Sequence, residues 1–565
     1  MSHVVPPHLA PSQFQLLQDR VARQYGEFGA AIETQESQEA LFADSWWKTT
    51  LRIVLGVFLA SAFLAFASHP TVTPGGWENS FRLDTVFVVV WAPLLVWTMS
   101  RLKLWRSVRI YLVLALFIES LSETMFRELG EGGYWNSVLW PAAAAFYGTL
   151  KEFSNVPGGS VGTFFLLTLG LLYRSIWGKK AADYVAPPAF ARNTLLVFLC
   201  TIVVLAFWGI AHGGQVDWTF RQTIHLLQLP LVALVFLYGL RIPRDLPAIG
   251  TAFVLIAMVR SLLVLWVYFG VCTFGIGGVA VAGTVRHGVP QPEWCTNHSD
   301  TVLFVVALGI LLAHALEQRH RRTTLRCLAA GAVIMAGIIF NNRRLAFVSL
   351  AAVPLVMYLA LEPSKRKLRV TIALGLLIPV VIGYVLIGSE MTSRSVLLKP
   401  AKLVMSVVDQ RDTSSEARDI ENENLIYTLE QSPFVPSGFG HEYLHSPNNP
   451  PVDLTEVFAN YKLLAHNGVL WLWSIAGVVG FTLLWMLYPI AGTLALRAYR
   501  GALTPLERSA SLAALATVAI CVIQIWGDQG FSSYLTLVTF GVAFAVASRL
   551  AVRAEQGGRT VARPW

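Results

Sequence analysis

Charged side chains are scarce in this chain. Asp, Glu, Lys and Arg make up 14% of its 565 residues, against 55% hydrophobic residues, whereas a soluble domain ordinarily carries about 25% charged residues. The mean hydropathy is +0.56. This composition excludes an ordinary soluble protein and predicts one integral-membrane domain with appended loops.

Cysteine is also scarce, and its spacing does not suggest a metal or redox pair. The five cysteines are scattered, with no C-x-x-C motif. Three lie in apolar stretches, where small buried hydrophobic side chains are the natural interpretation. Cys272 and Cys295 flank a loop that the topology below places outside the cytoplasm, so a disulfide between them is an open alternative.

Signal peptide, internal repeat and nucleic-acid signature are missing as well. The first apolar run begins near Leu51, too late for a cleavable signal peptide, so we expect an uncleaved first span. No repeat or low-complexity tract is evident, and the net charge of +9 lies in short loops rather than on a basic stripe. Nucleic acid is therefore not an expected partner, and the charge fits membrane orientation instead.

Apolar runs, by contrast, are abundant and have the length of about 20 residues that a spanning helix needs. They predict an all-α polytopic membrane protein with about 14 transmembrane helices (12–14) and one large extracytoplasmic loop. The candidate spans are residues 51–68, 83–100, 109–124, 161–178, 193–212, 223–240, 247–272, 301–317, 323–341, 344–362, 368–388, 466–488, 507–526 and 531–549. Lys and Arg cluster on one side of this map, which is therefore the cytoplasm and holds both termini. Residues 135–150, with Pro141, break the parity and are interpreted as a re-entrant or interfacial helix.

The map divides the chain into five parts. They are a cytoplasmic segment with an amphipathic helix (1–48), a transmembrane region (49–389), a large periplasmic catalytic loop (390–465), C-terminal transmembrane helices (466–549) and a cytoplasmic tail (550–565). Helical spacing of apolar residues from Phe14 to Phe28 indicates that the first helix lies on the membrane surface. The large loop has six Lys and Arg against eleven Asp and Glu, a net charge of −5.

Two arginines break the charge rule. Asn341-Asn342-Arg343-Arg344 joins two spans on the outer side, where positive charge is unusual. Guanidinium groups suit phosphate through bidentate hydrogen bonds, so phosphate binding is one interpretation of this pair. Snorkelling to lipid headgroups, or pairing with the acidic loop, is the other.

The large loop contains two further signals. Arg418 ends the segment Ser414-Ser415-Glu416-Ala417-Arg418, and residues 424–430 have the composition of a short helix. The later turn Gly438-Phe439-Gly440 would let the backbone fold tightly under a ligand. A solvated arginine is the alternative interpretation of Arg418.

A zinc motif follows the turn directly. The residues from His441 to His445 read H-E-x-x-H, in which two histidines bind zinc from one face of a helix. Glycine before the motif and prolines after it leave room for about one helical turn. No metal site is therefore predicted, and a zinc protease is the disfavoured alternative.

A histidine begins the span after the loop. His466-Asn467 is followed, after nine residues, by Gly477 and Gly480. A histidine can take a proton from a sugar hydroxyl near neutral pH, and glycines three apart permit close helix packing. The alternative is an interfacial histidine that ends a span.

Together, the outer arginine pair, the S-x-x-R segment, the G-x-G turn and H-N resemble the O-antigen ligase and polymerase superfamily over residues 301–488. The pattern H-N-x9-G-x2-G matches that of O-antigen ligases in full, and three spans at the C-terminus also agree. The chain departs from this pattern in about two extra N-terminal spans, and in having Arg-Arg where one arginine is usual.

The resemblance implies a bacterial inner-membrane glycosyltransferase with a periplasmic site and no cofactor. Its donor would be a glycan on undecaprenyl diphosphate, and its acceptor a sugar hydroxyl of lipid A-core or of a second lipid-linked repeat unit of O-antigen or exopolysaccharide. Transfer to protein Ser or Thr is a third option, and membrane lipids are further partners. Inversion at the anomeric carbon is expected.

Carried over by position, Arg418 and either Arg344 or Arg343 would hold the donor diphosphate, and His466 would activate or orient the acceptor. Two guanidiniums would offset the charge that develops on a diphosphate leaving group. The expected catalytic set is His466, Arg418 and Arg344. The expected substrate-binding set is Arg343, Asn467, Gly438, Gly440, Arg260, His441 and His445.

Arg260 enters that set because it lies within a span, where ions are costly and often functional. A structural pair with Glu119, itself within another span, is the alternative. Weaker candidates for the same cavity are Arg221, His225 and Asp528.

The rival function is a flippase for lipid-linked oligosaccharides. Such transporters are expected to show internal halves and cationic residues along a central path. Here no repeat is evident, and the unusual residues gather at one face. The sequence therefore favours the glycosyltransferase.

Overall fold

The structure of the chain, a computed structural model, describes residues 41, 44–67, 93–118, 139–147, 162–178, 186–273, 285–286, 289–290, 295–296, 299–317, 321–341, 343–391, 398–408, 413–449, 463–528, 530–531 and 533–560. The described chain is built from helices, with one antiparallel pair of two-residue strands, Val285–Arg286 (β1) and Val289–Pro290 (β2). The predicted amphipathic helix on residues 1–48 and Glu119 lie outside the described residues.

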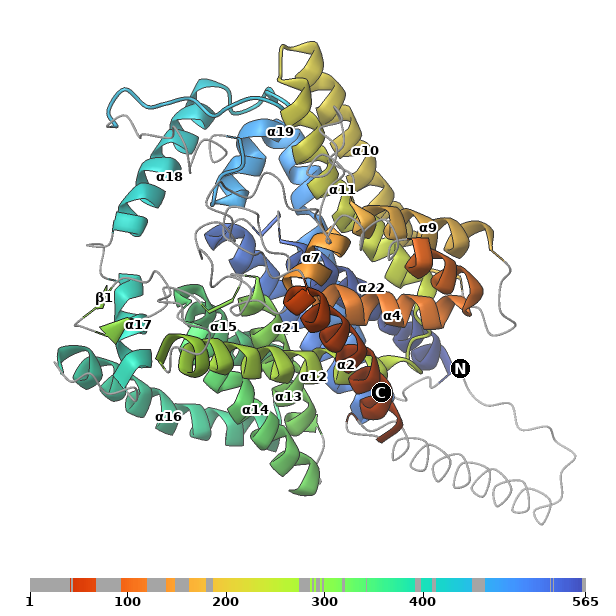
Figure 1. Cartoon of the computed structure of the whole chain (residues 1–565), viewed down its shortest axis with the longest axis vertical. Helices are drawn as coiled ribbons and strands as arrows, with labels where there is room; N and C mark the ends of the chain where they lie inside the picture. Colours follow the sequence, from red (N-terminus) through yellow and green to blue (C-terminus); the bar gives the residue numbers. More distant parts are fainter. Residues whose placement is uncertain are drawn as a thin grey trace, which may run out of the picture.

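The helices follow one another with short connections (Figure 1). Those before the strands are α2 (Asp44–Ala67), α4 (Leu104–Phe117), α7 (Trp140–Tyr147), α9 (Thr163–Trp177), α10 (Ala189–Ala211), α11 (Val216–Gly239), α12 (Leu246–Leu265) and the π-helix η3 (Trp266–Thr273). Those after them are α13 (Asp300–Glu317), α14 (Arg321–Asn341), α15 (Arg344–Ala360), α16 (Lys365–Glu390), α17 (Lys399–Val408), α18 (Thr413–Gln431), α19 (Gly468–Trp485), α20 (Leu487–Arg500), α21 (Pro505–Gly527) and α22 (Tyr534–Thr560).

The prediction of an all-helical membrane protein is confirmed. Among the described residues, nine helices are long and apolar enough to cross a membrane, and α9 and α15 are shorter apolar helices. From residue 161 onward, every predicted span coincides with a helix. The count of 14 stays a prediction, and the predicted interfacial helix at 135–150 is represented by the eight residues of α7.

Burial separates a central helix from a peripheral one. The apolar window of α22 is 89% buried, whereas that of α16 is 0% buried. In Figure 1, α22 runs through the middle of the bundle and α16 lies at its lower left edge. A helix that is apolar and exposed on all sides is stable in lipid and not in water, so α16 presents its surface to the bilayer.

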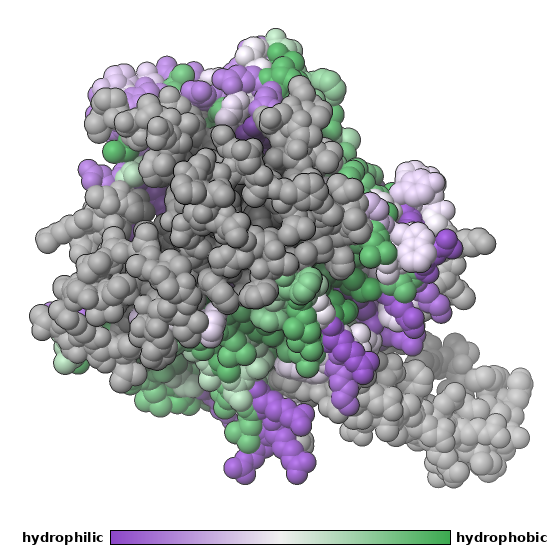
Figure 2. All heavy atoms as spheres, in the orientation of Figure 1, coloured by the Kyte–Doolittle hydropathy of each residue, from purple (hydrophilic) through white to green (hydrophobic). Residues whose placement is uncertain are grey.

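One end of the bundle gathers the charged turns that the sequence assigned to the cytoplasm. Arg553 Nε lies 2.8 Å from Glu507 Oε1, and the Tyr499 hydroxyl donates to Glu317 Oε1 at 3.3 Å. Glu507 also belongs to a capping box at the start of α21, because its backbone N–H donates to the Thr504 hydroxyl. Figure 2 shows hydrophilic residues at the lower end, below α13 and α14, and again at the top, over α18.

Candidate functional site

The opposite end of the bundle holds the predicted site, and α18 organises it. This helix covers 19 residues, from Thr413 to Gln431, rather than the short stretch 424–430 that the sequence suggested. Arg418 and Glu421 therefore lie three residues apart on one helix, and such residues are neighbours on the same face. Figure 1 shows α18 beside α19, at the upper left.

Glu421 holds the histidine of the H-N pair. Its Oε2 accepts a hydrogen bond from the His466 backbone N–H at 3.0 Å and lies 3.1 Å from the imidazole Nδ1. The Glu421 side chain is 7% exposed and that of His466 is 21% exposed. The carboxylate is therefore shielded from water, while the imidazole still reaches the surface.

The next pair of residues fastens the same two elements. Asn467 Nδ2 donates to Asn422 Oδ1 at 3.0 Å. Asn467 is also the N-cap of α19, because its Oδ1 accepts from the Leu470 backbone N–H at 3.2 Å. These bonds give Asn467 a positioning role between α18 and α19.

Arg418 points from α18 to the end of α21. Its Nη1 donates to the Gly527 carbonyl at 3.1 Å, and its Nη2 lies 3.6 Å from Asp528 Oδ1. A guanidinium at the C-terminus of a helix satisfies a free carbonyl and complements the helix dipole. The side chain is 42% exposed, so part of the guanidinium remains open to a ligand.

The outer arginine pair lies at the same end of α21. Arg343 is the N-cap residue of α15 and Arg344 is its first residue. Leu345, which follows them, packs so tightly against Gly527 that a Cβ there would lie 2.7 Å from its Cδ1. Arg418 and the pair thus adjoin one residue, Gly527, although they are more than 70 positions apart in the sequence.

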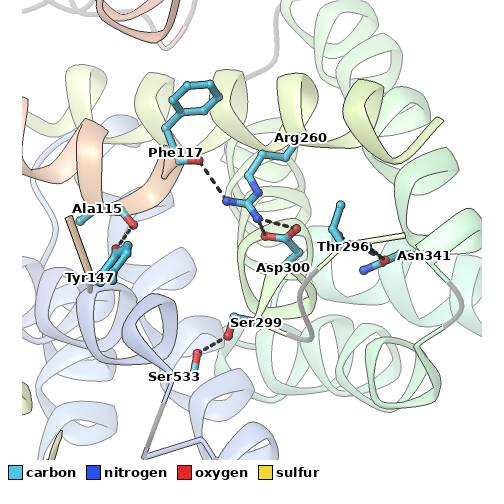
Figure 3. A network of polar contacts seen from close by, with 9 residues as sticks. All are labelled: Ala115, Phe117, Tyr147, Arg260, Thr296, Ser299, Asp300, Asn341 and Ser533. Atoms are coloured by element: carbon cyan, nitrogen blue, oxygen red, sulfur yellow. Dashed lines mark hydrogen bonds and ion pairs between the residues drawn. The ribbon is translucent and has the colours of Figure 1, made fainter. Parts of the chain in front are cut away.

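Asn341 fixes the turn that carries this pair. The side chain is 1% exposed, and its Oδ1 accepts from the Thr296 backbone N–H at 3.0 Å and from the Thr296 hydroxyl at 3.2 Å. Figure 3 shows this contact between the end of α14 and the segment that precedes α13.

The Gly438-Phe439-Gly440 turn packs against protein rather than lining an open surface. Both glycines have positive φ, 83° and 88°. A Cβ at Gly438 would lie 2.4 Å from the Gly209 backbone, and one at Gly440 would lie 2.3 Å from Thr219 Oγ1. The expectation that they underlie a ligand is therefore corrected, because the backbones of α10 and α11 occupy that space.

The H-E-x-x-H residues are not helical. Residues 441–446 have no regular secondary structure. His441 Nε2 lies 3.3 Å from the Gly209 carbonyl, and His445 Nδ1 lies 2.9 Å from the Ser446 carbonyl. The two histidines therefore lack the common helical face on which the zinc motif depends, and their place in the substrate-binding set stays a prediction.

Gly477 has a different role from the helix packing that the sequence suggested. It interrupts α19 with φ 59° and ψ 178°, a conformation that favours glycine. A Cβ there would lie 2.5 Å from the Phe434 carbonyl oxygen. The glycine admits the segment that follows α18, while Gly480 makes the expected helix contact, with Leu205 of α10.

Arg260 is removed from the substrate-binding set. Its side chain is 1% exposed and forms an ion pair with Asp300, with Nη2 2.6 Å from Oδ1. Its Nη1 donates to the Phe117 carbonyl at 3.0 Å. Figure 3 shows the guanidinium enclosed between α4, α12 and α13. Enclosure by protein on these sides leaves no face for a donor lipid.

The sequence did not single out Glu421 or Asn422. Both would have been visible had the helix been extended back to Thr413, since they lie one turn after Arg418. Asp528, which was only a weak candidate, becomes a direct neighbour of Arg418. Tyr443 was also missed. Burial raises the pKa of its phenol above the ordinary value, and the Glu421 and Glu442 carboxylates raise it further.

A comparison with protein families bears on this arrangement. Residues 328–485 match the family model described as O-Antigen ligase. The chain carries an O-antigen ligase domain. This domain begins within α14, ends at the last residue of α19, and supports the O-antigen ligase and polymerase superfamily as the source of the resemblance. No curated protein matches the chain.

The O-antigen ligase domain contains most of the site but not all of its supports. It includes the arginine pair, α18 and His466. Residues outside it complete the packing: Asp528 contacts Arg418, and Gln222 of α11 accepts from the Gly440 backbone N–H at 2.8 Å. Together with the nine candidate spans, the domain identifies a multi-pass membrane protein that resembles glycan ligases and polymerases.

Proposed function

We propose that this protein is a metal-independent glycosyltransferase that moves a glycan from undecaprenyl diphosphate to a sugar hydroxyl. One observation carries the proposal: α18 presents Arg418 and the Glu421–His466 pair one helical turn apart. A cation for a diphosphate and a base for a hydroxyl are the two groups that this transfer needs, and here they are neighbours.

The donor side is assigned to Arg418 and to the turn of Arg343 and Arg344. As the bond between the anomeric carbon and the phosphate oxygen breaks, negative charge grows on the diphosphate. A preorganised guanidinium at that point stabilises the transition state more than the ground state. Arg418 is held by Gly527 and Asp528 but is still 42% exposed, which suits a group that waits for a ligand.

The acceptor side is assigned to His466. Its imidazole takes the proton of the sugar hydroxyl while the hydroxyl oxygen attacks the anomeric carbon. Attack from the face opposite the diphosphate inverts that carbon. Because the charged turns of Glu317 and Glu507 lie at the other end of the bundle, we place the site on the periplasmic face of the inner membrane.

Transfer by the purified chain tests the assignment. The assay supplies undecaprenyl-diphosphate glycan with either lipid A-core or a second lipid-linked repeat unit, so that a ligase and a polymerase give different products. Loss of general acid–base catalysis ordinarily costs about 10²–10⁴ in rate, and we expect that loss in His466→Ala. Arg418→Ala should lose at least about 100-fold, as for removal of a charge-stabilising donor.

Matched variants at exposed positions serve as controls. His212→Ala removes a histidine at the end of α10, and Arg192→Ala an arginine at its start, both of them exposed or half-buried and distant from α18 in the sequence. Both should transfer at the wild-type rate. Full activity in His466→Ala and Arg418→Ala would reject the site, and movement of intact donor across vesicles without transfer would favour a flippase.

Chelation provides a separate measurement. We expect transfer to proceed unchanged in EDTA, since guanidinium groups take the place of a metal at the diphosphate. EDTA-sensitive transfer would contradict this mechanism, and EDTA-sensitive proteolysis would return attention to His441 and His445.

A further inference from the structure

We propose that Glu421 is the positioning residue of the acceptor side: it holds the His466 imidazole with the proton on Nδ1, so that Nε2 is the free base. This inference rests on the proposed function and deepens it, because it names the atom that receives the hydroxyl proton. It turns a single histidine into a carboxylate–imidazole pair.

The hydrogen bonds around the carboxylate define the tautomer. Glu421 Oε2 accepts from the His466 backbone N–H at 3.0 Å, and Nδ1 lies 3.1 Å from Oε2 and 3.4 Å from Oε1. An ionised carboxylate can only accept hydrogen bonds, so Nδ1 must donate and carry the proton. In a neutral imidazole the other nitrogen, Nε2, then holds the lone pair.

The backbone around His466 is fixed from two directions, which makes the orientation of the ring reproducible. Glu421 binds His466, and the next residue of the helix, Asn422, binds Asn467. Asn467 in turn caps α19. Two successive residues of α18 thus grip two successive residues of the chain. Reacting groups need this kind of support to stay within about 0.5 Å of a productive geometry.

The charges that face the pair favour a carboxylate that stabilises a transient cation. Arg418 lies one turn earlier on α18, with Asp528 beside it. From the segment after the G-x-G turn come Tyr443 and Glu442, and the raised pKa of the Tyr443 phenol reflects burial first and then the two carboxylates. The phenol therefore stays neutral. With a side chain only 7% exposed, Glu421 acts on the imidazolium through a medium that screens little.

The proton and electron balance of the step is then complete. The acceptor oxygen forms a bond to the anomeric carbon as its O–H proton passes to His466 Nε2. The bond from the anomeric carbon to the phosphate oxygen breaks, and its electron pair leaves with the diphosphate beside Arg418. The resulting imidazolium is stabilised by Glu421, as in other carboxylate–histidine arrangements, and returns its proton to solvent.

Nuclear magnetic resonance on the full-length chain tests the tautomer without any assay of activity. With ¹⁵N-histidine labelling in detergent, the His466 signals are assigned by their loss in His466→Ala. We expect a protonated Nδ1 and an unprotonated Nε2 in the wild type. In Glu421→Gln the neutral amide can accept from Nδ1 or donate to it, so both tautomers should appear. A wild-type His466 protonated on Nε2, or an unchanged spectrum in Glu421→Gln, would overturn the proposal.

The kinetic test separates positioning from folding. Glu421→Gln preserves the shape of the side chain, and we expect kcat to fall at least about 100-fold while KM for the lipid-linked donor stays within about twofold, since the donor contacts are elsewhere. Glu421→Asp keeps the carboxylate and should recover part of the loss. Glu423→Gln, an exposed glutamate two residues along α18, should match the wild type.

The outcomes distinguish this inference from the function on which it rests. An active wild type with a fully active Glu421→Gln overturns the role of Glu421 alone. A wild type that transfers from no lipid-diphosphate donor overturns the proposed function, and the tautomer measurement then decides the Glu421–His466 pairing independently.

Discussion

At the residue scale, the environment of each arginine decides what it can do. Arg260 and Arg418 both pair with an aspartate, but the Arg260–Asp300 pair is buried and direct, whereas Arg418 is 42% exposed and 3.6 Å from Asp528. A buried, fully engaged guanidinium stabilises the fold. A half-exposed guanidinium with a distant partner can exchange that partner for a diphosphate.

The buried pair yields a stability prediction. Arg260→Ala leaves the Asp300 carboxylate buried without its cation, which ordinarily costs about 3–5 kcal/mol. We expect a lower melting temperature in detergent. The double replacement Arg260→Met with Asp300→Leu removes both charges and should melt above Arg260→Ala. A single variant as stable as the wild type would contradict this account.

Gly477 yields a second prediction at the same scale. In Gly477→Ala the new Cβ would meet the Phe434 carbonyl at 2.5 Å, at a φ of 59° that alanine disfavours. The variant should be destabilised and lose transfer activity. Gly492→Ala in α20 is the control, because its Cβ would meet only Leu515, at 3.8 Å. Equal thermal stability of the two variants would argue against the crossing at Gly477.

At the scale of elements, α18 is the part of the chain where sequence and structure differ most. Its residues are polar and have no apolar stripe, so helical periodicity could not predict its start at Thr413. Long-range bonds stabilise it instead. Asn424 Oδ1, for example, accepts from the Ser446 backbone N–H at 2.8 Å, which ties the following segment along the helix.

Helix caps at the two ends of the bundle make a third prediction. Thr504→Ala and Asn467→Ala each remove an N-cap hydrogen bond, a loss of about 1 kcal/mol. Both should lower the melting temperature. Only Asn467→Ala should also lower kcat, since Asn467 joins α19 to α18 through Asn422. An equal kcat loss in Thr504→Ala would mean that general destabilisation, rather than site geometry, is responsible.

At the scale of the whole molecule, two polar ends flank an apolar body. Arg322 begins α14 at one end, and Glu423 lies on α18 at the other. Apolar helices such as α16 present their side chains between these ends. This arrangement fits a bilayer across the middle of the bundle.

Labelling from the two sides of the membrane checks this orientation. With exposed Cys200 replaced by serine, Arg322→Cys and Glu423→Cys place single thiols at exposed sites. An impermeant maleimide should label Glu423→Cys from the periplasm and Arg322→Cys only from the cytoplasm. Labelling of both from one side would contradict the predicted topology.

The sequence by itself determined the membrane-crossing segments and the neighbourhood of the site. A span is recognised by its length and apolarity, which are local properties, so from residue 161 onward the spans coincide with helices. The H-N-x9-G-x2-G pattern is also local, and its segment matches the O-antigen ligase model.

Only the tertiary structure decided which side chains meet. Arg260 pairs with Asp300, 40 residues away, while Glu421 contacts His466 across 45 residues and Arg418 reaches Gly527 across 109. Such pairs depend on how whole helices pack, and no local periodicity records that. The same reason explains Gly438, Gly440 and Gly477, whose lack of a side chain has its use only where another backbone crosses.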